Sequence, residues 1–208
     1  MIKIEVVSDT ICPWCYIGKR NFDLALKELP EMNISFKYTT FQLDPNTPSE
    51  GVNRKNYVEK KFNKDRYTEI KKNISNEALK SGIPNITNTL DIIPNTFDSH
   101  RLIYWAIEYG CQLEAVEMIF KAYFEESKDI GNITVLLKIA ERLGMDSEVI
   151  MDRFKNDEDR KVVEDEERKA RENGVMGVPS YIINDGMTLT GSQPVNSIVK
   201  LLQHLNKN

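Results

Sequence analysis

The chain has 208 residues, of which 40% are hydrophobic and 29% charged, a balance typical of a globular protein with one domain or a domain and an elaboration. Its net charge of −4 argues against binding to nucleic acid, which requires clustered excess positive charge, so we expect no nucleic acid as partner. No apolar stretch approaches the roughly 20 residues of a membrane-spanning helix, so we also expect no membrane as partner, and three cysteines do not form the disulfide framework of a secreted domain.

The first predicted element is a strand at the N-terminus. Ile2, Ile4 and Val6 alternate with polar residues, which is typical of a half-buried strand. The strand begins at once, and no long apolar segment with a small-residue cleavage site precedes it. We therefore expect no signal peptide and a cytoplasmic location.

Two cysteines separated by two residues follow this strand, in the sequence Cys12-Pro13-Trp14-Cys15. A run with helical spacing comes next, and its main apolar residues are Ile17, Leu24, Leu26 and Leu29. Residues three apart at the start of a helix share one face, which brings their Cα atoms near the roughly 5.5–6 Å that a disulfide prefers. A Cys-x-x-Cys motif between a strand and a helix indicates a redox pair.

The position of each cysteine predicts its role. Cys12 is expected at the helix N-terminus, where unpaired N–H groups and the positive end of the helix dipole favour a thiolate. Cys15 lies one turn further in and is expected to be shielded and less acidic. Cys12 is therefore predicted to be the attacking nucleophile and Cys15 the resolving thiol, while Pro13 suits the first helical turn and Trp14 completes the loop without adding charge.

Two alternatives to a redox pair are a zinc site and a pair of inert buried cysteines. A structural zinc ion usually takes four ligands, with a second pair at short spacing. Outside the motif only Cys111, His100 and His204 are available, and they are scattered along the chain. We predict no metal site and expect Cys111 to be a small buried residue or a bystander.

Further along the chain, residues 33–41 alternate as a second strand and residues 44–49 form a turn. Residues 52–172 then show almost wholly helical spacing of apolar residues. The predicted helices cover 57–79, 97–109, 113–123, 136–143, 149–154 and 157–172.

Strands return near the C-terminus, where Asn184-Asp185-Gly186 predicts a hairpin between residues 180–183 and 187–190. A last helix is expected over residues 195–205. The order β-α-β, helices, β-β-α indicates a helical domain inserted into a small α/β domain. We expect residues 1–48 and 158–208 to form the α/β domain and residues 49–157 the insert.

The sequence resembles the DsbA-like thiol-disulfide oxidoreductases, and most closely their FrnE-type branch. This family implies an α/β fold, thioredoxin-like with a large inserted all-helical domain. Two positions depart from the family pattern. Thr40 stands where a proline is common, and Ser180 stands where an aromatic or aliphatic residue is common. The resemblance covers nearly the whole chain and rests on residues 8–18, 41–45, 95–101 and 174–180 with 191–194.

The resemblance also implies roles for residues far from the cysteines. The Val178–Pro179 peptide bond is expected to be cis and to lie beside Cys12, with the Val178 backbone free to bind an extended substrate. An ordinary proline at the start of a strand is the alternative. His100 is assigned to the active-site face as a substrate-binding residue, against the alternative of a packing residue.

The predicted function is thiol-disulfide exchange through a mixed disulfide, with no cofactor other than the redox-active Cys12–Cys15 disulfide. The uncharged Trp14 and the expected cytoplasmic location favour reduction or isomerisation over net oxidation. The expected partners are thiol- or disulfide-containing proteins or peptides, with glutathione as the alternative co-substrate, and the chain is expected as a monomer or homodimer. The rival functions are a kappa-type glutathione-dependent transferase or isomerase and a non-catalytic, chaperone-like peptide-binding module.

Overall fold

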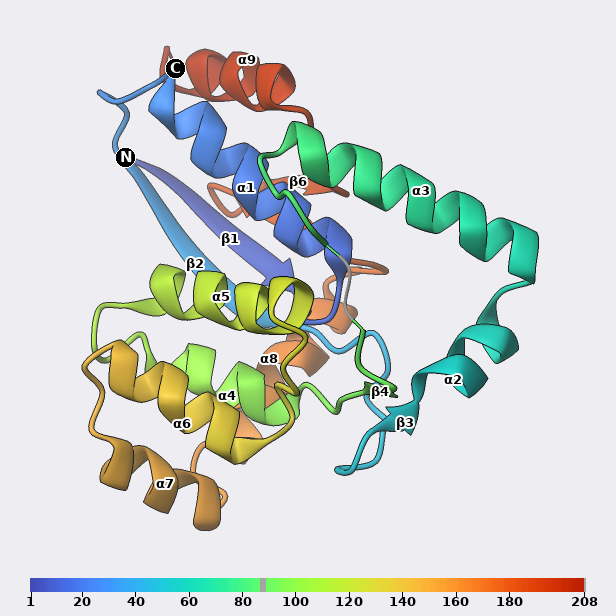
Figure 1. Ribbon diagram of the computed structural model, residues 1–208. Helices are drawn as coiled ribbons and strands as arrows, with labels where there is room; N and C mark the ends of the chain where they lie inside the picture. The colour runs from blue at the N-terminus through green and yellow to red at the C-terminus, as the bar shows by residue number, and fades with distance from the viewer. Residues whose placement is uncertain (87–88, 208) are drawn as a thin grey trace.

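The fold is built on a four-stranded sheet with the strand order β2-β1-β5-β6 (Figure 1). The computed structural model describes residues 1–86 and 89–207. β1 pairs in parallel with β2 and antiparallel with β5, and β5 pairs antiparallel with β6. These four strands confirm the prediction from alternation and from the hairpin signal. Their bounds are β1 (Ile2–Ser8), β2 (Ile34–Thr40), β5 (Ser180–Ile183) and β6 (Met187–Thr190).

Helices cover both faces of the sheet. α1 (Pro13–Lys27) and α9 (Val195–Leu205) lie side by side on one face. α8 (Arg160–Glu172) packs on β2, and its Ala170 joins Val7 in a small core on the opposite face. On α1 the buried side chains include Tyr16, Ile17, Phe22 and Ala25, whereas Leu24 and Leu26 of the same helix are only partly buried.

The helical insert docks on β2, which is an edge strand. Gln112, at the start of α5, binds this edge with its side-chain amide. Its Oε1 atom accepts a hydrogen bond from the Tyr38 N–H at 2.9 Å, and its Nε2 atom donates to the Tyr38 carbonyl at 2.9 Å. The helices of this group are α4 (Phe97–Trp105), α5 (Gln112–Phe120), the π-helical turn η1 (Lys121–Glu125), α6 (Ile133–Arg142) and α7 (Ser147–Lys155).

The structure corrects the prediction of one helix over residues 57–79. There are two helices, α2 (Arg54–Lys61) and α3 (Lys64–Lys80), and the side chain of Asn63 accepts a hydrogen bond from the Arg66 N–H to begin the second. The insert is also not all-helical, because β3 (Val52–Asn53) and β4 (Ile92–Ile93) form a two-stranded antiparallel sheet. Strands of two residues carry no periodicity that a sequence pattern could indicate.

The ends of two predicted helices also differ. α4 ends at Trp105 rather than Tyr109, and Tyr109 is exposed. α8 begins at Arg160 because Asp157 and Asp159 adopt a left-handed backbone conformation before it. The domain boundaries expected after residues 48 and 157 stay a prediction.

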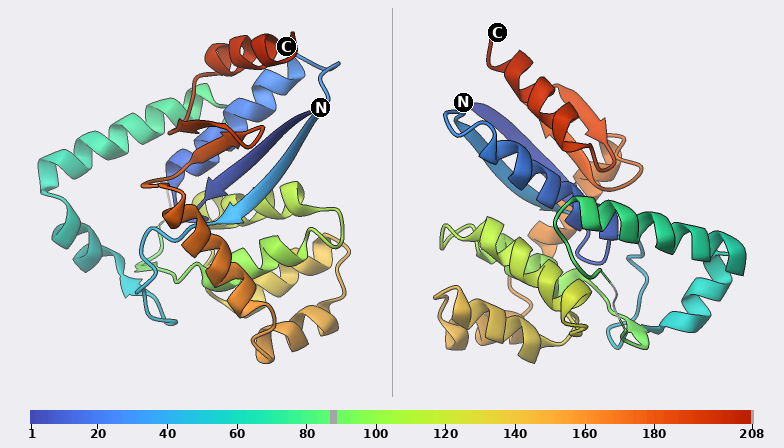
Figure 2. Two further views of the ribbon diagram at one scale, coloured as in Figure 1. Left: turned by 180° about the vertical axis from the view of Figure 1, so that it is seen from behind. Right: turned by 45° about the horizontal axis from the view of Figure 1, so that its top comes forward.

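α2 and α3, which we call the helical arm, project from the rest of the molecule (Figures 1 and 2). α2 buries no residue, and α3 buries only Ala78. Within residues 1–86 and 89–207, no helix is long and apolar enough to cross a membrane.

Candidate active site

Cys12 and Cys15 lie at the start of α1, shortly after the end of β1. Cys12 is the N-cap residue, with extended backbone (φ −85°, ψ 114°), and Pro13 opens the helix. The Cys15 N–H donates to the Cys12 carbonyl at 3.0 Å. The two cysteines are free thiols and are buried, with exposed fractions of 4% and 2%. These positions at the helix start agree with the sequence prediction.

The loop between α8 and β5 approaches Cys12 from the other side. Its Val178–Pro179 peptide bond is cis. The Cys12 thiol donates a hydrogen bond to the Val178 carbonyl, with 3.7 Å between Sγ and the oxygen. The expected cis bond and its position beside Cys12 are therefore confirmed, while the substrate-binding role of Val178 and Pro179 stays a prediction.

Cys15 is held in the protonated form by its surroundings. Burial raises the pKa of the Cys15 thiol well above its ordinary value, and a hydrogen bond and charge interaction with Cys12 raise it further. The Ser8 hydroxyl and the Asp9 backbone act in the opposite direction. Because a thiolate is the reacting species, Cys15 is the harder of the pair to activate unless groups nearby stabilise its charge.

Asp9 anchors the loop that carries Cys12, and the sequence analysis did not single it out. Its carboxylate is fully buried and accepts hydrogen bonds from the Leu43 N–H at 2.7 Å and the Ile11 N–H at 3.4 Å. Through these hydrogen bonds the Asp9 carboxylate connects the end of β1 to the segment that follows β2. Asp9 lies in the short stretch between a predicted strand and two cysteines. A carboxylate at such a position is the sequence signal for a residue that supports the cysteine loop.

His100 lies beneath this loop, with its Nε2 atom 3.5 Å from the Asp9 Oδ1 atom. Its side chain is only 3% exposed. The expectation that His100 faces the active-site region agrees with this position. Its role in substrate binding stays a prediction.

The N-terminal turn of α4 braces the same loop. The Thr10 and Ser99 hydroxyls lie 2.8 Å apart in a hydrogen bond, and Ser99 also donates to the Thr96 carbonyl. The Gln42 amide donates to the Thr96 hydroxyl at 3.1 Å. The stretch 95–101 therefore connects the insert to the redox pair through hydrogen bonds.

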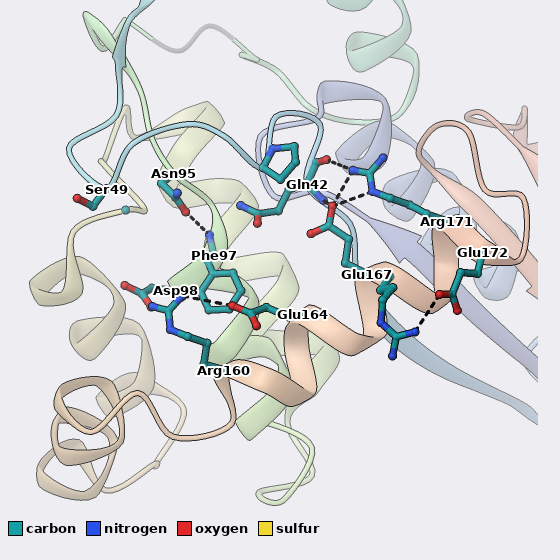
Figure 3. A pocket seen from close by; sticks show the side chains of 13 residues that line it. Gln42, Ser49, Asn95, Phe97, Asp98, Arg160, Glu164, Glu167, Arg171 and Glu172 are labelled. Atoms are coloured by element: carbon teal, nitrogen blue, oxygen red, sulfur yellow. Dashed lines mark hydrogen bonds and ion pairs between the residues drawn. The ribbon is translucent and has the colours of Figure 1, made fainter.

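A hollow of about 630 Å³ lies between α8, the segment after β2 and the start of α4 (Figure 3). Neither cysteine lines it. Its charges are largely paired within the protein: Arg171 binds Glu167 and the Gln42 carbonyl, and Arg168 binds Glu172. We therefore assign the candidate active site to the surface at Cys12 and not to this hollow. Among the described residues, no group of three or more His, Cys, Asp or Glu side chains could hold a metal ion.

Comparison with known proteins identifies a family and a relative of this chain. A model of the family described as "DSBA-like thioredoxin domain" matches residues 3–203. The uncharacterized protein YwbO of Bacillus subtilis (strain 168) is 28% identical over 189 residues, which cover 88% of this chain and 88% of YwbO. The match to the family therefore includes the cysteine pair and the cis-proline loop.

Solved structures share the fold over nearly the whole chain. The probable DsbA oxidoreductase SCO1869 from Streptomyces coelicolor has a TM-score of 0.86 at 24% identity, covering 98% of this chain and 89% of its own. The cytosolic disulfide reductase DsbM from Pseudomonas aeruginosa, solved with GSH, has a TM-score of 0.66 at 15% identity, covering 98% and 99%. At these identities the two structures establish the thioredoxin-like fold alone.

Proposed function

Since the chain belongs to the DSBA-like thioredoxin domain family, we propose that Cys12 and Cys15 carry out thiol-disulfide exchange on disulfide substrates. The observation that carries this proposal is the position of Cys12. It caps a helix N-terminus and lies against the carbonyl that precedes a cis-proline. Helix N-termini in general favour a thiolate through their unpaired backbone N–H groups and the helix dipole, which supports this role for Cys12.

The reaction has two exchange steps in the reducing direction. The Cys12 thiolate attacks one sulfur of the substrate disulfide, which breaks the substrate S–S bond and releases the first substrate thiolate, which takes up a proton. Cys15 then loses its proton and attacks the Cys12 sulfur of the mixed disulfide. The second substrate sulfur leaves and takes up a proton, so the substrate gains two electrons and the protein keeps a Cys12–Cys15 disulfide.

We place the net reaction on the reducing or isomerising side. Trp14 is the residue before Cys15, is partly buried and supplies no charge that would hold a thiolate. Potentials of such pairs range from about −120 to −270 mV, against a cytosolic poise of roughly −220 to −320 mV. A pair between these limits is largely reduced in the cytoplasm, where we place the protein. The disulfide reductase DsbM is cytosolic, which supports this location.

Protein or peptide disulfides are the substrates that the site favours. The Val178 carbonyl lies next to the Cys12 sulfur, so an extended chain can pair with the backbone of this loop as it delivers its disulfide. Glutathione is the alternative co-substrate, and the DsbM structure with GSH supports it.

Redox titration of purified protein against glutathione buffers, read through Trp14 fluorescence, tests the proposal. We expect one reversible two-electron transition that Cys12→Ser abolishes. Cys111→Ser is the matched control, since it removes the third thiol, and we expect its transition to be unchanged. Absence of a transition would contradict the proposal.

Two rival functions predict other results. A glutathione-dependent transferase or isomerase of the kappa type would keep its activity in Cys12→Ser, because those relatives carry a serine at this position. A chaperone-like module would bind peptides equally well in Cys12→Ala and in either redox state. The presence of both cysteines at the helix start favours the redox enzyme over both rivals.

A further inference from the structure

Tyr181 carries a hydroxyl that the structure leaves without a partner. The residue lies in β5, two positions after the cis-proline, and is 1% exposed. Among the residues that the structure describes, its hydroxyl oxygen has no hydrogen-bond partner. A buried polar group without a partner costs about 1–3 kcal/mol and calls for an explanation.

The strand register directs this hydroxyl to the helix that carries the cysteines. Tyr181 is paired with Val6 of β1, so it shares the face of the sheet that α1 covers. The hydroxyl reaches α1 at Gly18, where a Cβ atom would overlap it. Gly18 is three residues after Cys15 and therefore lies on the same face of the helix, one turn further along.

The charges of both sulfurs act on Tyr181, although no hydrogen bond joins its hydroxyl to either sulfur in this structure. Burial raises the pKa of its phenol well above the ordinary value, and the charges of Cys15 and Cys12 raise it further. A protonated phenol is a hydrogen-bond donor toward an anion. The Ser8 hydroxyl approaches Cys15 from the end of β1, on the same face of the sheet as Val6.

We propose that Tyr181 becomes a hydrogen-bond donor to Cys15 when this thiol ionises in the resolving step, and that its hydroxyl is without a partner in the reduced protein for this reason. The proposal rests on the proposed function and deepens it by assigning a group that stabilises the second, buried nucleophile. Resolution starts from the mixed disulfide between Cys12 and the substrate. The Cys15 proton leaves, and the resulting thiolate accepts hydrogen bonds from Tyr181 and Ser8.

The thiolate then forms a bond to the Cys12 sulfur as the bond between Cys12 and the substrate breaks. The departing substrate sulfur carries the electron pair and takes up a proton. Tyr181 donates a hydrogen bond and keeps its proton, so no additional oxidant or base enters the balance.

The first test isolates Cys15 in a background with both Cys12→Ser and Cys111→Ser, where its ionisation is followed by thiolate absorbance. Adding Tyr181→Phe removes only one hydroxyl and fits the same cavity. We expect the Cys15 thiolate to form at higher pH when Phe replaces Tyr181. The control is Tyr104→Phe, because the Tyr104 hydroxyl lies near the carboxylates of Asp159 and Glu166 and away from the redox pair.

The second test measures how fast the mixed disulfide between Cys12 and glutathione resolves in the otherwise wild-type chain. We expect Tyr181→Phe to slow resolution about three- to tenfold, the effect of one lost hydrogen bond, and Tyr104→Phe to leave it unchanged. An unchanged Cys15 titration and rate, with a higher unfolding midpoint in Tyr181→Phe, would overturn the proposal. That result would mean that the Tyr181 hydroxyl is a buried group without a hydrogen-bond partner that destabilises the fold and has no role in resolution. The titration of Cys15 requires no substrate. It therefore tests the role of Tyr181 even if the protein does not catalyse thiol-disulfide exchange.

Discussion

Cys12 and Cys15 are three residues apart, yet their surroundings differ. Cys12 caps the helix beside the Val178 carbonyl, whereas burial and Cys12 together raise the pKa of Cys15. We expect Cys15→Ala to accumulate a mixed disulfide at Cys12, because the first exchange step proceeds and the resolving thiol is missing. Mass spectrometry after incubation with oxidised glutathione measures this adduct.

The matched variant is Cys12→Ala, which keeps Cys15 and removes the residue at the helix start. It is expected to form little adduct, since the remaining thiol is 2% exposed and burial, the largest cause of its raised pKa, does not depend on Cys12. More adduct in Cys12→Ala than in Cys15→Ala would reverse the assigned roles. Both variants are made in the Cys111→Ser background so that the third thiol does not contribute.

Asp9 determines the position of the Cys12 loop through its carboxylate. Replacing it with alanine leaves the Leu43 and Ile11 N–H groups without their acceptor, and a buried donor left unsatisfied costs about 1–3 kcal/mol. We expect Asp9→Ala to lower the free energy of unfolding by about 2–4 kcal/mol, as measured by urea denaturation. Asp9→Asn keeps one acceptor oxygen and is expected to lose less. Equal stability of all three proteins would mean that the carboxylate does not anchor the loop.

At the scale of elements, Gln112 closes the edge of the sheet by binding both backbone groups of Tyr38. Exposed strand edges otherwise pair with other chains. Gln112→Leu fills a similar volume and leaves two buried backbone groups unpaired, so we expect a loss of about 2–4 kcal/mol in urea unfolding. The exposed Glu114 of the same helix provides the control, and Glu114→Ala is expected to change stability by less than about 0.5 kcal/mol. A neutral Gln112→Leu would show that water replaces the amide.

Glu117 of α5 joins the insert to α1 by ion pairs. Its carboxylate lies 2.9 Å from the Lys19 Nζ atom, 3.3 Å from an Arg20 nitrogen and 3.2 Å from the Lys121 Nζ atom. Burial opposes its ionisation, but the three cations outweigh burial and hold the pKa of Glu117 below its ordinary value. The ion pairs of Glu117 therefore stabilise the fold at a pH above about 4.3, the pKa of this side chain in the unfolded protein. This contribution is lost as the pH falls through the lower pKa that Glu117 has in the folded protein.

Glu117→Gln removes the charge and keeps the shape of the side chain. We expect it to unfold at lower urea concentration than wild type at neutral pH, and the difference to shrink in acid below the unfolded pKa of about 4.3. Glu114→Gln on the exposed side of the same helix is expected to show no such dependence. A difference between Glu117→Gln and wild type that persists in strong acid would contradict the ion-pair origin.

Over the whole molecule, patterns of period two and 3.6 predicted the central sheet and most helices, because burial of one face leaves a repeating apolar signal. The cysteine pair and the proline of the cis bond were also visible in the sequence. Other features depend on contacts between distant segments, which no local pattern records. Asp9 is linked to Leu43, and Tyr181 reaches Gly18 through strand pairing and helix packing. The break at Asn63 was missed because a capping side chain overrides the helical spacing on both sides.

The helical arm differs from the rest of the molecule in how little it buries. α2 has no buried residue and α3 has only Ala78, whereas α1 buries eight residues between the sheet and its neighbours. Short helices without tertiary packing are marginal in water, so local opening of the arm requires much less free energy than global unfolding. In hydrogen exchange followed by mass spectrometry, we expect amides of α2 and the first half of α3 to exchange orders of magnitude faster than those of α1.

Two changes to the protein, oxidation of the cysteine pair and a substitution in α2, are expected to alter hydrogen exchange in different regions. Oxidation of the cysteine pair acts at the start of α1, far along the chain from the arm, so it is expected to alter protection near Cys12 and to leave exchange in α2 unchanged. Helix-favouring Asn56→Ala, at an exposed position inside α2, is expected to slow exchange within the arm alone. Protection of α2 equal to that of α1 would mean that the arm is held by contacts beyond this chain, such as a second copy or a bound polypeptide.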